Sequence, residues 1–217
     1  MKPIKYLLVF FLTIIFILSC DNKDKPENFD YGSVKNGIYQ NDYFKFKMVL
    51  PTSWIVQTKE QTENLANTGK QLIAGDDDKM KAIIKASEIN IAYLLSVFQF
   101  EVGTPVDYNP SIMIVAENIK NAPGIKNGSD YLFQTRKMML QSQFKYDYIS
   151  DEFELEKIGE IEFYKLDTGI NLSDMEIKQI YYATVLKGFG IGFIISFNSD
   201  EQKDVLLDSM HSLTIAK

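Results

Sequence analysis

Five glutamates within eleven residues are the most conspicuous side chains in this sequence that could do chemistry. They are Glu152, Glu154, Glu156, Glu160 and Glu162. At the two-residue period of a β-strand, the first three share one face. A three-residue loop over 157–159, with Gly159 in the left-handed region, would place Glu156 opposite Glu160 and Glu154 opposite Glu162. The sequence therefore predicts a hairpin of facing carboxylates, with these apolar side chains inside: Phe153, Leu155, Ile161 and Phe163.

Such a hairpin admits two interpretations, because like charges facing each other across strands destabilise a sheet by up to about 1 kcal/mol. The favoured one is a solvated face whose repulsion is relieved by Lys165 or Lys178, since charged runs on strands are usually surface. The other is a binding site for a cation or a basic partner. Calcium is then the candidate, because carboxylate oxygens suit a hard cation.

Cys20 is the only cysteine, and it stands at the end of a short apolar segment. Lys2 and Lys5 precede thirteen residues, 6–18, that are almost all apolar, and Ser19 follows them. A transmembrane helix needs roughly 20 apolar residues, so this run is short for a span. A positive start, a short apolar core and a small residue are typical of a secretory signal. We therefore predict that residues 1–19 are a signal peptide.

The segment Ile17-Leu18-Ser19-Cys20 resembles the lipobox of bacterial lipoproteins. The resemblance implies that Cys20 receives a diacylglyceryl thioether, becomes the first mature residue and takes a further acyl chain such as palmitate. A thiolate is the side chain best suited to attack a lipid donor, and two or more acyl chains anchor a protein stably. The expected location is the cell envelope, on the non-cytoplasmic side of a membrane that the sequence does not identify. An uncleaved signal anchor and an ordinary secreted protein stay open as alternatives.

The composition narrows the function classes. Removing residues 1–19, which carry two lysines and no acid, takes the net charge from −6 to −8. This acidic balance disfavours nucleic acid and anionic lipid as main ligands. No cysteine would remain for a disulfide, so the fold must depend on its hydrophobic core, and its length suits one domain.

No other motif indicates catalysis or a cofactor. The lone His211 has no second His or Cys with which to form a zinc cluster or a Cys–His pair. The aspartates at 76–78 lack the glycine and the distant glutamate of a calcium loop, so we expect them to cap a helix. We therefore expect neither an enzyme nor a cofactor. The alternative is an envelope hydrolase whose carboxylates come from the glutamates or from the loops at 101–110 and 120–128.

The elements that would position these residues follow from the hydrophobic pattern. Residues 20–36 are polar and predict a lipidated N-terminus and a flexible tether, so a single domain is expected over 37–217. Strands are expected at 37–40, 43–48, 54–56, 89–100, 112–116, 152–157, 160–169, 175–187 and 190–198. Helices are expected at 58–73, from 76–78 onward, at 129–143 capped by Ser129 with Leu132, Met139 and Leu140 inward, and after the cap Ser199. This order predicts an α+β fold with a mainly antiparallel twisted sheet flanked by helices.

The opening Asn41-Asp-Tyr-Phe44-Lys-Phe46, followed by Leu50-Pro51-x-x-Trp54, resembles the start of PsbP-like domains, including bacterial lipoproteins of the DcrB kind. The resemblance extends over about residues 37–217 and implies an αβα sandwich that closes with a hairpin and a C-terminal helix. It implies a binding or assembly factor with an unknown protein partner. The family has no shared catalytic motif, so no functional residue is carried over from it.

Overall fold

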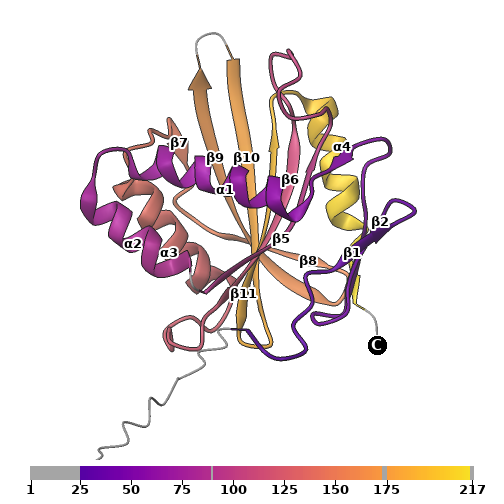
Figure 1. The fold of residues 1–217 in the computed structure, drawn as a ribbon, viewed down its shortest axis with the longest axis horizontal. Helices are drawn as coiled ribbons and strands as arrows, with labels where there is room; N and C mark the ends of the chain where they lie inside the picture. Colours follow the sequence, from indigo (N-terminus) through magenta and orange to yellow (C-terminus); the bar gives the residue numbers. More distant parts are fainter. Residues whose placement is uncertain (1–24, 89, 173–174, 216–217) are drawn as a thin grey trace, which may run out of the picture.

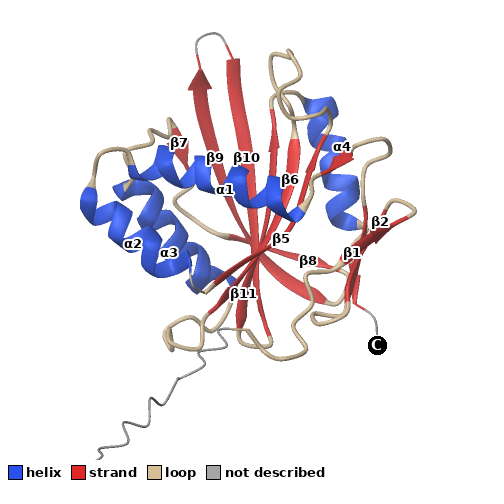
Figure 2. Ribbon diagram, viewed as in Figure 1, coloured by secondary structure: helices blue, strands red, loops and turns tan. Residues whose placement is uncertain are grey.

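The computed structural model describes residues 25–88, 90–172 and 175–215, so the expected signal peptide and Cys20 lie outside the described residues. Within them the chain forms two antiparallel sheets and four helices (Figures 1 and 2). The predicted α+β class, with an antiparallel sheet flanked by helices, is confirmed. None of the described helices is both long and apolar enough to cross a membrane.

The larger sheet has the order β4-β5-β6-β11-β10-β9-β7 in the described ranges, and β8 also pairs with β9. Its strands are β4 (Ile55–Val56), β5 (Ile91–Phe98), β6 (Ser111–Asn118), β7 (Tyr148–Ile149), β8 (Glu154–Ile158), β9 (Ile161–Leu172), β10 (Met175–Leu186) and β11 (Phe189–Phe197). The smaller sheet consists of β1 (Ser33–Lys35), β2 (Ile38–Asn41), β3 (Phe46–Val49) and β12 (Thr214–Ile215). Every strand expected from the sequence forms, and the short β1, β7 and β12 were not predicted.

Alternation along β11 separates the two faces of the larger sheet, because successive side chains of a strand point to opposite sides. On one face Phe193 and its alternate neighbours are buried against Leu206 and Met210 of α4 (Asp200–His211) and against Phe46 of the smaller sheet. On the other face Gly190 lies beneath Tyr131 of α3 (Gly128–Gln141). The core therefore lies mainly between the larger sheet, α4 and the smaller sheet.

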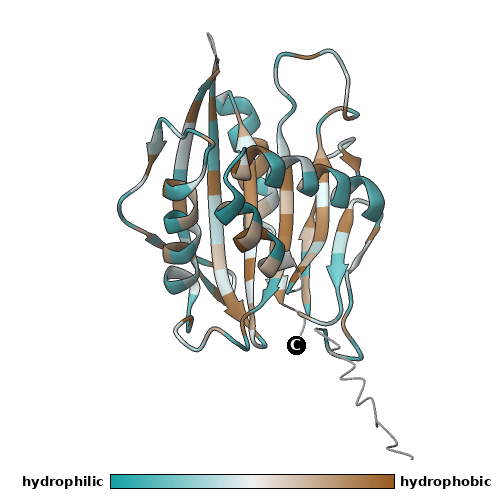
Figure 3. Ribbon diagram, turned by 60° about the vertical axis from the view of Figure 1, so that its left-hand side comes forward, coloured by the Kyte–Doolittle hydropathy of each residue, from teal (hydrophilic) through white to brown (hydrophobic). Residues whose placement is uncertain are grey.

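Three helices cover the second face: α1 (Lys59–Ala74), α2 (Asp78–Glu88) and α3 (Gly128–Gln141). Figure 3 shows apolar strands, in brown, between these helices and the elements on the far side. The layers are thus the three helices, the larger sheet, and then α4 with the smaller sheet. Within the larger sheet, β11 runs the length of the molecule, so its two ends lie at opposite ends (Figure 1).

The helix ends follow their capping residues in most cases. Ser199 Oγ accepts from the Gln202 amide at α4, as predicted, and Thr58 and Gln61 form a capping box at α1 that the sequence analysis did not name. Asp77 Oδ1 accepts from the amides of Lys79 and Met80, which confirms the capping role expected for 76–78.

The expectations for α3 were partly wrong. Asn127, not Ser129, is its N-cap, because the Asn127 side chain accepts from the Asp130 amide. Leu132 and Met139 are buried as expected. Leu140, however, is 60 % exposed, since α3 packs on the sheet through a narrower stripe than the sequence suggested.

The expectation that the domain begins at 37 was also wrong, because residues before Gly37 belong to the fold. The ring of Phe29 lies 5.4 Å from Phe189 and 5.9 Å from Phe44 between centroids, and β1 pairs with β2. Asp30 Oδ1 and Oδ2 accept from the amides of Gly32 and Asp42. The hydrophobic pattern did not predict this segment, because Phe29 stands alone in a polar stretch and its aromatic partners come from distant parts of the chain. The folded region therefore starts near Phe29.

Candidate functional site

The glutamate hairpin forms with a different register from the predicted one. Its turn has two residues, Gly159 and Glu160, and pairs Ile158 with Ile161. Gly159 has φ 60°, a positive angle at the first turn position, as a type II′ hairpin turn requires. Glu154 therefore faces Lys165, and Lys157 faces Glu162. No pair of glutamates faces each other across these two described strands, so the arrangement that suggested a cation site is absent.

The change of register also exchanges the two faces of β8. Glu156 lies opposite Phe163, which is fully buried, so both side chains point to the α4 face of the sheet. Leu155, predicted to be inside, is 57 % exposed. A one-residue difference in the position of the turn moves every side chain of a strand to the other face. Here Ile158 occupies the strand rather than the turn.

Glu154, Glu156, Lys165 and His211 form a connected group, which we call the Glu156 cluster. Lys165 Nζ lies 3.0 Å from Glu154 Oε2 and 3.2 Å from Glu156 Oε2. His211 Nε2 lies 2.7 Å from Glu156 Oε1. The histidine, expected to be a helix-surface residue without an orienting partner, thus has a carboxylate partner from a distant strand.

The hydrogen bonds of the Glu156 cluster shift the pKa values of Glu156 and Lys165. Burial acts to raise the pKa of Glu156, but hydrogen bonds from His211 and Lys165 outweigh it and hold the pKa below its usual value. Burial acts to lower the pKa of Lys165, but hydrogen bonds to Glu154 and Glu156 outweigh it and raise the pKa. Glu154 and Glu156 thus already have partners within the protein, namely Lys165 for both and His211 for Glu156. The remaining glutamates, Glu152, Glu160 and Glu162, are exposed.

No metal centre is formed among the described residues, because nowhere do three His, Cys, Asp or Glu side chains gather closely enough to hold an ion. The relief of charge that the favoured interpretation assigned to Lys165 or Lys178 comes from Lys165. Lys178 pairs with Glu176 instead, with its Nζ 3.3 Å from Glu176 Oε2.

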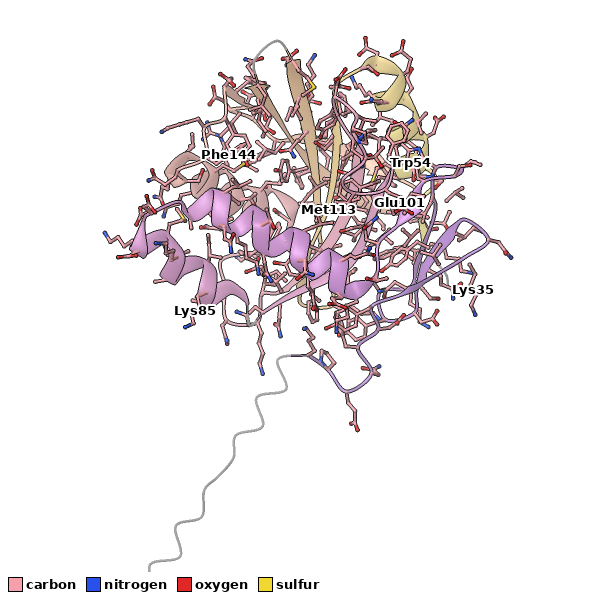
Figure 4. All side chains as sticks on the ribbon, turned by 45° about the horizontal axis from the view of Figure 1, so that its top comes forward. Lys35, Trp54, Lys85, Glu101, Met113 and Phe144 are labelled. Atoms are coloured by element: carbon pink, nitrogen blue, oxygen red, sulfur yellow. The ribbon has the colours of Figure 1, made fainter. Side chains whose placement is uncertain are left out.

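An open cavity lies at another place, where the β9–β10 hairpin, the end of β11, the start of α4 and the loop after β5 meet. We call it the β10 groove. It has a volume of about 660 Å³ and is lined by Asp107, Leu172, Met175, Glu176, Lys178, Phe197, Asn198, Ser199 and Asp200. These elements meet at the top of Figure 1, and Figure 4, where the loop residue Glu101 is labelled, turns this end toward the viewer.

One wall of the β10 groove is a strand that has a partner on only one side. β10 pairs with β9 from Met175 onward, where Met175 faces Leu172. Its pairing with β11 begins three residues later, at Lys178 opposite Phe197. Residues 175–177 therefore form a short sheet edge beside the groove.

The sequence analysis found only part of this site. The loop at 101–110, proposed as one source of cleft residues, contributes Asp107, whereas the loop at 120–128 lies outside the lining. The signal that could have revealed the edge was the length of the strands. The expected strand at 175–187 is longer than its partner at 190–198, so one end had to extend beyond the pairing.

A further pair, the half-buried Glu117 and Tyr131, was missed. Tyr131 Oη donates to Glu117 Oε2 at 3.0 Å, and a Cβ at Gly190 would lie 2.5 Å from Tyr131 Cδ2. Burial raises the pKa of Glu117 despite the hydrogen bond from Tyr131. Burial, with the nearby Glu117 carboxylate, also raises the pKa of Tyr131. The pair has a plain structural role, since it joins α3 to the strand β6 above a glycine.

Comparison with known proteins gives several distant structural similarities, of which three are described. No family model and no curated protein matches the chain. The chain is similar to the cyanobacterial PsbP of Synechocystis sp. PCC 6803, with a TM-score of 0.45 and 16 % identity over 85 % of this chain and 96 % of that one. A protein from Bacteroides thetaiotaomicron gives a TM-score of 0.44 and 13 % identity over 85 % of this chain. The chain spans only 50 % of the length of that protein.

The third similar structure is LpqN, involved in cell envelope biogenesis of Mycobacterium tuberculosis. It gives a TM-score of 0.38 and 12 % identity over 59 % of this chain and 79 % of LpqN. The assignment of the fold class rests on the antiparallel sheets and their helices themselves.

Proposed function

We propose that this protein is an envelope lipoprotein that acts as a non-enzymatic binding or assembly module. A lipid on Cys20 would hold it on the non-cytoplasmic side of a membrane, and the β10 groove would receive a protein partner. The observation that carries the proposal is the position of the groove relative to the N-terminal end of the fold.

The two ends of β11 define that position. Phe29, the first of the described residues to pack against the core, lies against Phe189 at the start of β11. The β10 groove includes Phe197 at the end of the same strand. A strand rises about 3.3 Å per residue, so these nine residues separate the two sites by roughly 26 Å. An anchor that precedes Phe29 would leave the groove at the far end of the domain, where a partner can reach it.

The form of the groove supports binding rather than chemistry. It opens to solvent, and its walls combine apolar side chains such as Leu172 and Phe197 with carboxylates. Asp107, Glu176 and Asp200 come from three different elements, so they line the walls as a distributed charge. Open acidic surfaces of this kind recognise partners by complementary charge.

The experiment that tests the anchor compares Cys20→Ser with the wild-type chain, using Asn22→Ala as the control. Detergent partitioning and mass spectrometry of the mature N-terminus are measured. We expect the wild type and the control to start at Cys20 with an acyl mass and to partition with detergent, and Cys20→Ser to remain unlipidated. A wild-type chain that starts elsewhere, or that carries no acyl mass, would overturn the proposal.

Crosslinking in native membranes tests the binding role. A photoreactive residue in place of Glu101, on the loop beside the groove, should crosslink to a protein. The same residue in place of Lys85, on α2, serves as the control position. Equal crosslinking at both positions would argue against a partner at the groove.

A hydrolase whose carboxylates come from the loops remains the alternative. The observation that favours it is Asp107, which the loop at 101–110 brings to the β10 groove beside Glu176 and Asp200. The alternative predicts an activity on envelope polymers that Asp107→Asn abolishes while the variant still folds. The binding module predicts no such activity in the wild-type protein.

A further inference from the structure

The free edge of β10 has the geometry of a docking site for an extended chain. Residues 175–177 pair with β9 on one side only, and β11 ends at Phe197 before it reaches them. Beyond Phe197 the chain turns through Asn198 and Ser199 into α4. A strand laid in the β10 groove would therefore continue the ladder of the sheet in the place that β11 has left. Addition of a strand to an exposed edge is a common mode of peptide recognition, because the backbone supplies the hydrogen bonds.

The side chains around this edge are apolar near the sheet. Phe197 is buried, whereas Leu172 at the end of β9 is 50 % exposed. Met175 lies opposite Leu172 and accepts a hydrogen bond at its sulfur from the Asn198 side chain. The volume of about 660 Å³ falls in the range of roughly 300–1,000 Å³ that small ligands and short segments occupy. The groove thus offers apolar contacts for alternate side chains of an added strand.

The rim of the groove is acidic. Asp107, Glu176 and Asp200 carry negative charge, and the one basic lining residue, Lys178, is already paired with Glu176. Neither Asp107 nor Asp200 forms an ion pair with any other described residue. Asp200 also stabilises α4, because its negative charge lies in the first turn, at the positive end of the helix dipole. Asp107 lies in a loop and has no such role.

We infer that the β10 groove binds an extended segment of a partner protein that alternates lysine or arginine with apolar residues, and that this segment adds as a strand to residues 175–177. The inference rests on the proposed function, since it names the partner class for the same site. The acidic rim selects against a nucleic acid, an anionic headgroup or the acidic surface of a second copy of this chain, because like charges repel.

The test uses the full-length protein in detergent micelles and a fluorescent peptide in which lysine alternates with valine. Fluorescence anisotropy measures the Kd, and the same peptide with glutamate in place of lysine is the control. We expect the lysine peptide to bind and the glutamate peptide not to bind. High salt should weaken the binding, because exposed charges are screened. Equal binding of the two peptides would overturn the inference.

Matched variants locate the site on the protein. Asp107→Asn with Glu176→Gln should weaken binding of the lysine peptide by roughly five- to tenfold, a factor appropriate to two exposed charge contacts. Glu160→Gln with Glu162→Gln removes the same charge from the exposed turn of the glutamate hairpin and should leave the Kd unchanged. Melting temperatures confirm that both variants fold. Equal Kd values for the two double variants would place the peptide elsewhere and contradict the inference.

Backbone methylation of the peptide tests strand addition without changing the protein. Only alternate residues of an added strand direct their N–H groups at the sheet edge. Of two lysine peptides N-methylated at alternate sets of residues, one should lose binding and the other should keep it. If both bind alike, the contact is electrostatic only and strand addition is excluded. None of these measurements depends on Cys20, so a failure here is distinct from a failure of the lipid anchor.

Discussion

The Glu156 cluster and the β10 groove both gather carboxylates, but they use them in opposite ways. In the Glu156 cluster, the carboxylates of Glu154 and Glu156 share Lys165, and His211 completes the group. In the β10 groove, carboxylates from separate elements line an open cavity, and Lys178 balances only one of them. The density of acidic residues in the sequence is greatest at the first region. The acidity available to a ligand is greatest at the second, because what matters is the charge that the fold leaves unbalanced.

Charge reversal should separate the two regions most strongly. Glu156→Lys would place a second ammonium group beside Lys165 in a half-buried position and would remove the carboxylate partner of His211. It should lower the free energy of unfolding by about 2–4 kcal/mol. Asp107→Lys, on the open loop of the β10 groove, should change it by less than about 0.5 kcal/mol. Urea unfolding measures both, and similar losses in the two variants would abolish the distinction.

Replacing one lysine in each region by methionine should also destabilise the Glu156 cluster more than the β10 groove, by a smaller margin in the free energy of unfolding. The Lys165 side chain is 21 % exposed, and Lys165→Met would leave two carboxylates without their shared cation. We expect a loss of about 1–3 kcal/mol. Lys178→Met removes a lysine whose side chain is 53 % exposed, so its loss should stay within about 0.5 kcal/mol. A larger effect at Lys178 in chemical denaturation would show that the groove, too, depends on its ion pair.

The pH dependence of the Glu156 cluster has a definite sign. The pKa of Glu156 is lower in the folded protein than its usual value, because the hydrogen bonds from His211 and Lys165 outweigh burial. Its carboxylate therefore stabilises the fold above the usual pKa, and this contribution is lost as the pH falls through the lowered pKa. The difference in melting temperature between the wild type and Glu156→Gln should shrink on acidification from neutral pH. A difference that grows instead would mean that the carboxylate is not stabilised as the geometry indicates.

Calcium should have the smallest effect. Since Glu154 and Glu156 already share Lys165 as a partner, millimolar calcium should not raise the melting temperature through this hairpin. Any rise in the wild type should persist unchanged in the Glu154→Gln and Glu162→Gln double variant. A rise that disappears in the double variant would restore the cation interpretation and make the two regions alike.

The sequence was informative where local interactions decide the structure. The strands from β2 to β11 other than β7 follow from alternation. The cap Ser199 follows from side-chain hydrogen bonds within a few residues. The class of the fold follows from their order. These features need no knowledge of which distant segments meet.

The parts that sequence reasoning missed depend on such distant meetings. The partner of His211 comes from β8, and the partners of Phe29 come from β3 and β11 or the residues beside them. The register of the glutamate hairpin depends on the burial of Ile158 in the main core, which places this residue in the strand opposite Ile161 rather than in the turn. The β10 groove exists because two paired strands differ in length and because a loop and a helix happen to end beside them.

The position of Phe29, only a few residues after Cys20, limits how far the domain could move from a lipid anchor. If Cys20 carries the lipid, eight residues separate it from Phe29, and the nine steps of a fully extended chain between them span at most about 30 Å. Such a short linker would confine the domain to a thin layer at the membrane surface. It would thereby raise the effective concentration of the domain toward partner proteins bound to the same membrane. Partners fixed to that membrane, or brought to it, would be met far more often than freely diffusing ones. Lengthening the linker with a flexible insert before Lys25 would dilute that advantage without touching a single contact of the fold.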